Sequence, residues 1–120
     1  DGTWLASTGD DQTVRIWDTS TGQTRHTLTG HTGMVDGVAV SPDGTWLAST
    51  GDDQTVRIWE ARTGDQQDLC RIEQPGRSCA WTRDRGLFVG GAAGIYAFAF
   101  TPLHDPRLTV TGGTGPDPPS

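Results

Sequence analysis

Short runs of β-favouring residues, separated by turn residues, recur along the chain and predict an all-β fold. The clearest runs are residues 35–40, 45–50 and 55–59, and the last of these alternates polar and apolar positions. Residues 41–44 (Ser-Pro-Asp-Gly) and 51–54 (Gly-Asp-Asp-Gln) lie between the runs and have the composition of tight turns. Strands joined in this way form an antiparallel meander, and no apolar period of 3.6 residues predicts a helix.

An internal repeat organises these runs. Residues 1–17 read DGTWLASTGDDQTVRIW, and residues 43–59 repeat the same 17 residues, so the period is 42. A period of about 40–45 residues is typical of a four-stranded propeller blade. A third, weaker unit covers residues 78–100, and residues 107–111 are expected to add one short outer strand.

Two dipeptides make the resemblance to a known family specific. Gly30-His31 is followed 28 residues later by Trp59-Glu60, and the first unit ends in Trp17-Asp18. This frame resembles the Gly-His to Trp-Asp frame of the WD repeats, the WD40 family, although Glu60 replaces the Asp. The resemblance, which is strong over residues 1–66, implies an all-β WD40 β-propeller fragment of about two and a half four-stranded antiparallel blades.

The repeat divides the chain into four segments. Residues 1–24 are expected to hold the last three strands of one blade, and residues 25–66 a complete WD repeat with its flanking strand. Residues 67–111 are expected to form a degenerate closing blade, and residues 112–120 a disordered tail. Family propellers close with about four to eight blades. We therefore expect missing blades upstream in the same chain or, if the chain is complete, self-association into a ring.

The resemblance also implies a buried network of four polar side chains in each blade, formed by His, Ser or Thr, Asp and Trp. A buried carboxylate is costly without partners. A His that donates to Asp and accepts from Ser, with the Trp N–H completing the chain, would satisfy every group. The residues in the matching positions are His31, Ser49, Asp53 and Trp59 in the second unit, and Ser7, Asp11 and Trp17 in the first.

The third unit has lost these positions. Phe98 stands where the Trp would be, Val89 lies near the Ser position, and Ala92 or Ala93 lies near the Asp position. We therefore expect apolar packing in place of the polar network. The segment 94–98 (Gly-Ile-Tyr-Ala-Phe) resembles the closing blade of bacterial WD-repeat proteins.

Ser49, His31 and Asp53 are also the residue types of a catalytic triad. A nucleophile must be exposed to substrate, and the positions of these residues in the repeat predict a buried structural network instead. The chain has no G-x-S-x-G, P-loop or dinucleotide-binding motif, and its cysteines and histidines lack the spacing of a metal site. We therefore expect no catalytic residue, no metal and no cofactor.

Composition narrows the class of partner. The net charge of −6 and the pI of about 4.7, with no basic cluster, argue against nucleic acid. No apolar run approaches the roughly 18 residues of a membrane-spanning helix, so no membrane contact is expected. Cys70 and Cys79 are expected to be reduced thiols of a cytoplasmic protein. All nine basic residues are Arg, which suggests a GC-rich bacterial gene.

A protein or peptide is the partner that remains. In the family, partners dock on the narrower top face around the central channel, and the residues at the corresponding positions are Met34, Asp36, Asp52 and Asp10. An exposed Met beside carboxylates would suit a basic or amphipathic peptide. The alternative is that these residues form only a solvated acidic rim.

Two functions are consistent with the sequence. The first is a non-catalytic protein–protein interaction or scaffold module, which would be the C-terminal sensor or recruitment part of a larger bacterial signalling protein. The second is a propeller enzyme with an active site at the channel mouth, built mainly from missing blades. The identity of the two 17-residue segments argues against the enzyme, because identical blades cannot each supply a distinct catalytic group.

Overall fold

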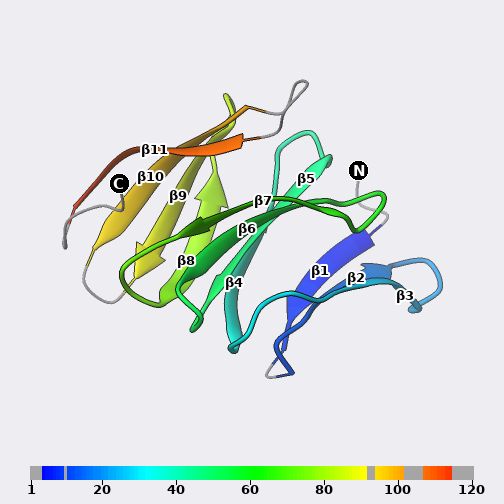
Figure 1. Cartoon of the computed structure of the whole chain (residues 1–120). Coiled ribbons are helices and arrows are strands. Elements are labelled where there is room, and N and C mark those ends of the chain that lie inside the picture. The colour runs from blue at the N-terminus through cyan, green and yellow to red at the C-terminus, as the bar shows by residue number, and fades with distance from the viewer. Residues whose placement is uncertain (1–3, 10, 92–93, 102–106, 115–120) are drawn as a thin grey trace.

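Eleven β-strands make up the part of the chain that the computed structural model describes, which is residues 4–9, 11–91, 94–101 and 107–114. No helix occurs in these ranges, and the all-β prediction is confirmed. The strands form three antiparallel sheets that follow one another along the chain (Figure 1). Within the described ranges there is thus no helix that is long and apolar enough to cross a membrane.

Each sheet is a meander in which consecutive strands are neighbours. The first sheet has the strands β1 (Trp4–Thr8), β2 (Val14–Asp18) and β3 (Thr24–Leu28). The second sheet has β4 (Val35–Val40), β5 (Trp46–Gly51), β6 (Thr55–Glu60) and β7 (Gln66–Arg71). The third sheet has β8 (Gly76–Trp81), β9 (Gly86–Gly91), β10 (Ile95–Thr101) and β11 (Arg107–Thr114).

The boundaries between the sheets do not fall at the segment boundaries that the repeat predicts. The boundary expected at residue 24 lies inside β3, and the boundary expected at residue 66 lies inside β7, because the last strand of each sheet belongs to the segment that begins the next repeat. β11 runs to Thr114, past the boundary expected at residue 111, and residues 115–120 of the expected tail lie outside the described residues. β11 pairs with β10 and gives the third sheet its fourth strand.

The turn between β5 and β6 carries two of the candidate site residues. Gln54 takes a φ of 61°, a conformation that costs a non-glycine residue about 1–2 kcal/mol. The Ile72 N–H donates to the Gln54 carbonyl at 2.8 Å and so holds this turn against the segment that leads into the third sheet. Gln12, at the same position of the first repeat, has a φ of 72°, so the turn conformation belongs to the repeated sequence.

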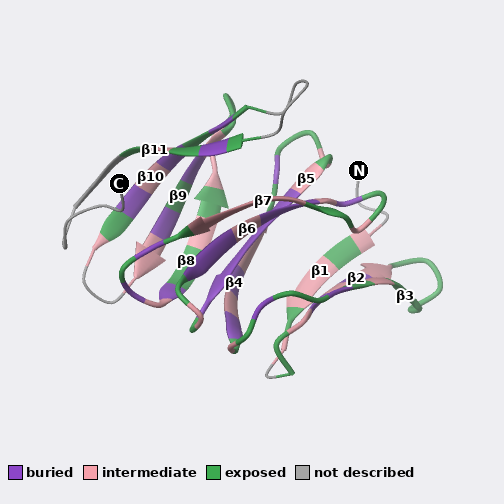
Figure 2. Cartoon of the chain, viewed as in Figure 1, coloured by how far each residue is buried: buried purple, intermediate pink, exposed green. Residues whose placement is uncertain are grey.

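The second sheet lies between the other two and packs on both (Figure 1). Leu47 and Ala48 are successive residues of β5, so their side chains point to opposite faces of the sheet, and both are fully buried. Burial is accordingly most continuous along β5 and β6 (Figure 2). A strand that is buried on both faces is apolar or small at nearly every position, which explains why β5 reads Trp-Leu-Ala-Ser-Thr-Gly.

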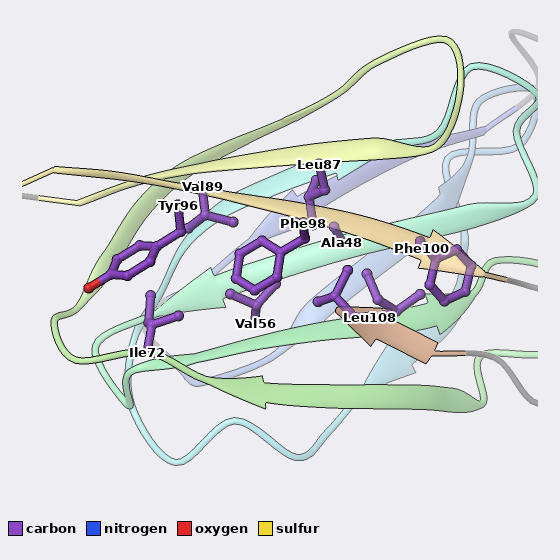
Figure 3. Close-up of a cluster of buried hydrophobic side chains, with 10 residues drawn as sticks. Ala48, Val56, Ile72, Leu87, Val89, Tyr96, Phe98, Phe100 and Leu108 are labelled. Carbon is purple, nitrogen blue, oxygen red and sulfur yellow. The ribbon is translucent and has the colours of Figure 1, made fainter. Parts of the chain in front are cut away.

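Two hydrophobic cores result from this stacking. The core between the first and second sheets contains Val14, Ile16, Leu28, Val35, Leu47, Trp59 and Ala61. The core between the second and third sheets contains Ala48, Val56, Ile58, Ile72, Leu87, Val89, Tyr96, Phe98, Phe100 and Leu108 (Figure 3). Full burial of one Leu, Ile or Phe side chain contributes about 1.5–3 kcal/mol, so the contacts between sheets are the main source of stability.

Gly51 and Gly9 occupy the same position of the repeat but differ in what surrounds them, which gives a matched test of the packing. A Cβ on Gly51 would run into the backbone carbonyl of Met34, whereas a Cβ on Gly9 would meet only the carboxylate end of Asp11. We predict that Gly51→Ala lowers the free energy of unfolding by about 1–3 kcal/mol, since backbone cannot move aside easily. Gly9→Ala should change it by less than about 0.5 kcal/mol. Urea unfolding of both variants checks this, and equal losses would contradict the packing described.

Candidate functional site

A chain of hydrogen bonds crosses the second sheet and joins four of the candidate residues. The Trp59 indole N–H donates to Ser49 Oγ at 2.8 Å, and Ser49 Oγ lies 2.6 Å from His31 Nε2. His31 Nδ1 lies 3.0 Å from Asp53 Oδ2. Because a carboxylate only accepts, the imidazole proton is on Nδ1, and Nε2 accepts from the Ser49 hydroxyl. Each donor in the chain therefore has an acceptor.

The network ties together segments that are distant in sequence. His31 lies in the connection between β3 and β4, Ser49 in β5, and Trp59 in β6, while Asp53 lies in the turn between β5 and β6. His31 and Ser49 are buried, and Trp59 is almost fully buried in the core shared with the first sheet. The network therefore fastens the β5–β6 hairpin to the loop by which the chain enters the sheet.

Asp53 keeps its charge in this setting because it accepts several hydrogen bonds. The Thr32 N–H donates to its Oδ2 at 3.0 Å, and the Thr55 hydroxyl donates to its Oδ1 at 2.8 Å. Burial by itself would raise the pKa of Asp53, but these hydrogen bonds and His31 outweigh burial and lower it below the usual 3.8. The Arg57 guanidinium lies 3.6 Å from Asp53 Oδ2 and adds a positive charge next to this carboxylate.

His31 is neutral at neutral pH. Burial lowers its pKa below the usual 6.5, because a charged imidazole would lose its hydration, and the nearby Arg57 acts in the same direction. The Asp53 carboxylate opposes this shift without reversing it. A neutral His31 has one donor and one acceptor nitrogen, and the network uses both.

The first sheet contains part of the same network in a different environment. The Trp17 indole N–H donates to Ser7 Oγ at 2.8 Å, as in the second sheet. Asp11 instead binds Arg15 at 2.8 Å and the Thr13 hydroxyl at 2.7 Å, and these two interactions lower its pKa to about 2. The Asp11 side chain is 51% exposed and that of Asp53 is 4% exposed. The position equivalent to His31 would precede residue 1.

The third sheet has apolar side chains at the network positions. β8 begins 41 residues after β4, so the position equivalent to His31 is residue 72, which is Ile72. This equivalence was not recognised from the sequence. Val89 and Phe98 take the places of Ser49 and Trp59, and with Ile72 and Tyr96 they form one continuous buried cluster (Figure 3). Ala92 and Ala93, expected near the Asp position, lie outside the described residues.

The hydrogen bonds join Ser49, His31 and Asp53 in the same sequence as in a catalytic triad, but a substrate cannot reach the Ser49 hydroxyl. The Ser49 hydroxyl donates to His31 and at the same time accepts the Trp59 N–H, and Ser49 is completely buried. A nucleophile needs space in front of its oxygen for the substrate carbon. The geometry therefore assigns these residues a structural role.

The candidate docking residues lie at the end of the second sheet where β4 begins. Met34 is 38% exposed, and its carbonyl accepts the Asp52 N–H at 2.9 Å. Asp36 and Asp52 both bind one nitrogen of Arg77, at 2.9 Å and 2.8 Å. Burial and the neighbouring Asp52 raise the pKa of Asp36. Asp10, the fourth candidate, lies outside the described residues.

Arg77 was not identified from the sequence. It is the second residue of β8, as Asp36 is the second residue of β4, so opposite charges stand at equivalent positions of adjacent sheets. Alignment of the third unit on the second would have paired these two positions. Arg77 thus offsets one of the two carboxylate charges of Asp36 and Asp52, and Met34 stands beside an ion cluster that links two sheets.

The described residues contain neither a cluster of three or more His, Cys, Asp or Glu able to hold a metal ion nor a disulfide. Burial raises the pKa of Cys79 to about 12, and burial together with Asp68 raises the pKa of Cys70. Both side chains are therefore protonated thiols at neutral pH, and neither is an activated nucleophile.

Comparison with known proteins defines the class of fold. The structure is similar to the β-propeller domain of Cps50 (Swd1) from Myceliophteria thermophila, with a TM-score of 0.77 and 22% sequence identity. The match covers 91% of this chain and 35% of that chain. The chain therefore has the fold of part of a β-propeller. Residues 1–18 and 22–60 match the family model described as "WD domain, G-beta repeat", so these segments are similar to WD40 repeats.

Two sequence relatives match about a third of the chain. Ribosome assembly protein 4 of Chaetomium thermophilum is 56% identical over 39 residues, which are 32% of this chain and 8% of that protein. Nuclear distribution protein PAC1 of Mycosarcoma maydis is 48% identical over 42 residues, 35% of this chain and 9% of that protein. The matched part of the chain thus spans less than a tenth of the length of these relatives.

Ser49 and Ser7 allow the network to be tested with one identical substitution in two environments. Ser49→Ala leaves the buried Trp59 N–H and His31 Nε2 without partners, so we expect a loss of about 2–4 kcal/mol in the free energy of unfolding. Ser7→Ala removes the partner of the half-buried Trp17 alone, and water can replace it, so a loss below about 1 kcal/mol is expected. Chemical denaturation measures both values, and similar losses would refute a special role for the complete network.

The lowered pKa of His31 predicts how stability changes with pH. The unfolded chain binds a proton at His31 near pH 6.5, and the folded chain binds it only at lower pH. The stabilisation is therefore fully present above pH 6.5 and is lost as the pH falls from 6.5 towards the folded-state value, with a slope of at most about 1.4 kcal/mol per pH unit. His31→Gln should lack this slope. An unchanged slope in the variant would show that another group is responsible.

Proposed function

We propose that the chain is a non-catalytic platform for binding proteins or peptides, and that a partner docks around Met34 at the end of the second sheet. The observation that carries the proposal is the exposure of this apolar side chain next to polar groups that are already held in place. A flexible thioether fits varied apolar partner side chains, and fixed neighbours reduce the entropy lost on binding.

The surroundings of Met34 are rigid for two reasons. The Asp52 N–H binds the Met34 carbonyl, and Asp52 is itself held by Arg77. Two residues further along the chain from Asp52, Gln54 accepts the Ile72 N–H and fixes the same turn to the third sheet. A partner that contacts Met34 would therefore bind a surface shared by two sheets, which is how an interaction module differs from a single exposed side chain.

A non-catalytic role is supported by the burial or protonation of the residues that could act as nucleophiles or bases. Ser49, His31 and Asp53 are buried in the network, and the two cysteines are protonated thiols. WD40 propellers generally act as scaffolds, and the relatives named above carry names that refer to ribosome assembly and nuclear distribution. The first of these names, which refers to assembly, supports a role in bringing other macromolecules together.

The setting of the platform is part of the same proposal. We propose a cytoplasmic location and a position as the C-terminal sensor or recruitment part of a larger bacterial signalling protein. The exclusive use of Arg as the basic residue and the resemblance of residues 94–98 to bacterial closing blades support this setting. The sequence of the complete reading frame tests it: an effector domain upstream would support the proposal, and a eukaryotic gene without one would refute it.

Met34 and Val40 provide a matched test of the docking surface, because Met34 directly precedes β4, Val40 is the last residue of β4, and the two are 38% and 40% exposed. We predict that Met34→Ala reduces partner capture at least about fivefold, the effect of losing about 1 kcal/mol at a binding hot spot. Val40→Ala should leave capture unchanged. Immobilised protein and quantitative mass spectrometry of the captured proteins measure the ratio, and equal capture by both variants would reject this surface.

A further inference from the structure

A groove runs between the outer edges of the second and third sheets. β7 and β11 are the last strands of these sheets, at the edges opposite to β4 and β8, and they lie next to each other. The groove has a volume of about 690 Å³ and is lined by residues 68–71 of β7 and residues 107–110 of β11. Pockets that hold ligands in proteins have volumes of roughly 300–1,000 Å³, so this groove is large enough to hold one.

A small side chain in the second repeat leaves room for the groove. Cys70 stands 42 residues after Leu28, at the same position of the repeat. Leu28 is fully buried in the core between the first and second sheets, whereas Cys70 is only half-buried. Cys70 packs together with Leu108 and Val110 at the margin of the core between the second and third sheets. These three side chains give the groove an apolar floor.

The edge of β11 directs backbone groups into the groove. The Leu108 N–H donates to Asp68 Oδ2 on β7 at 2.6 Å, so it points away from β10. The direction of the backbone groups alternates along a strand, so Val110, two residues further on, also directs its N–H and C=O into the groove. No described residue outside β10 forms a hydrogen bond with Val110. A strand edge in this state is a template for one more strand.

The sequence of β11 leaves this edge unprotected. Proteins commonly prevent pairing at an edge strand with charged residues or proline. Residues 108–111 of β11 read Leu-Thr-Val-Thr and contain neither. The outer strand of the first sheet has Arg25 and His26, and that of the second sheet has Asp68 and Arg71. Of these three outer strands, β11 is therefore the one best suited to pair with an additional strand.

The charged side chains around the groove favour an acidic ligand. Arg71 and Arg107 line it and are exposed, and Asp68 is the one carboxylate among the lining residues. The Asp68 carboxylate already accepts the Leu108 N–H. The groove therefore has an excess of positive charge in a chain whose net charge is −6. An acidic side chain would be attracted to it and a basic one repelled.

We propose that this groove binds an extended, acidic segment of a partner protein, which pairs with β11 as a fifth strand of the third sheet. Apolar side chains of the segment contact Cys70 and Val110, and an acidic side chain binds near Arg71 and Arg107. In this mode of recognition, main-chain hydrogen bonds provide affinity and the contacts of alternate side chains provide specificity. Met34 precedes β4, at the other edge of the second sheet, so this site is separate from the docking surface proposed above.

Selection of random dodecapeptides displayed on phage against the immobilised 120-residue chain tests the proposal. Enriched peptides should alternate apolar with other residues and contain Asp or Glu. The Kd of the corresponding synthetic peptides should rise at least about tenfold in Cys70→Leu, which introduces the leucine of the first repeat into the groove. Val110→Pro should have a similar effect, because it removes the outward N–H without removing a bond to β10. If no enriched peptide shows these losses, the proposal is wrong.

A pair of arginine variants tests the charge preference. Arg71→Glu should raise the Kd at least about tenfold. Arg62→Glu changes an exposed arginine of the β6–β7 turn outside the groove and should bind like the wild type. Equal losses in both variants would show an unspecific attraction and overturn the proposal. Met34→Ala should also bind like the wild type, so failure of this proposal can be distinguished from failure of the docking surface at Met34.

Amide NMR of the ¹⁵N-labelled chain locates the bound peptide. Resonances of Leu69, Arg71 and Val110 should shift on titration, and hydrogen exchange of the Val110 N–H should slow, because the added strand accepts this hydrogen bond. Shifts confined to residues around Met34 would overturn the assignment. Far-ultraviolet circular dichroism and the unfolding midpoint verify that each variant is folded, and Cys70→Leu provides the test if Val110→Pro does not fold.

Discussion

The hydrogen-bond chain from Trp59 through Ser49 and His31 to Asp53 is the interaction on which the second sheet depends. Each member would be costly to bury alone, and together they leave no donor without an acceptor. The chain links a loop, two strands and a turn at one point. The β5–β6 turn that it holds also carries Asp52, so the same network fixes the rim beside Met34.

The three sheets differ in the side chains that occupy the positions of the polar network. The second sheet uses the complete polar network, and the first uses a Ser–Trp pair with an exposed Asp11 bound to Arg15. The third replaces the polar groups with a cluster that includes Ile72, Val89 and Phe98. A polar network is useful only if every member has its partner, and apolar side chains at these three positions avoid that requirement. Loss of the network in the third sheet is therefore compatible with a well-packed blade.

The surface around Met34 combines residues placed by one repeat with an ion pair between two sheets. The position of Met34 before β4 follows from the repeat, and so do the turn residues around Asp52. The pairing of Arg77 with Asp36 and Asp52 depends on the contact between the second and third sheets. The shape of an interaction platform at this edge would therefore depend on the stacking of the sheets as well as on the sequence of one blade.

The sequence by itself determined the all-β fold and most strands to within a residue or two, because strand alternation, turn chemistry and repeat period are local properties. β11 is an exception, since it runs to Thr114, past the end expected at residue 111. The members of the polar network were expected from the resemblance of the repeat to a known family. Only the tertiary structure decided how identical residues differ. Trp59 is almost fully buried and Trp17 is not, and Asp53 is enclosed while Asp11 faces solvent. The physical reason is that burial depends on the neighbouring sheet, which the residues of a repeat do not themselves contain.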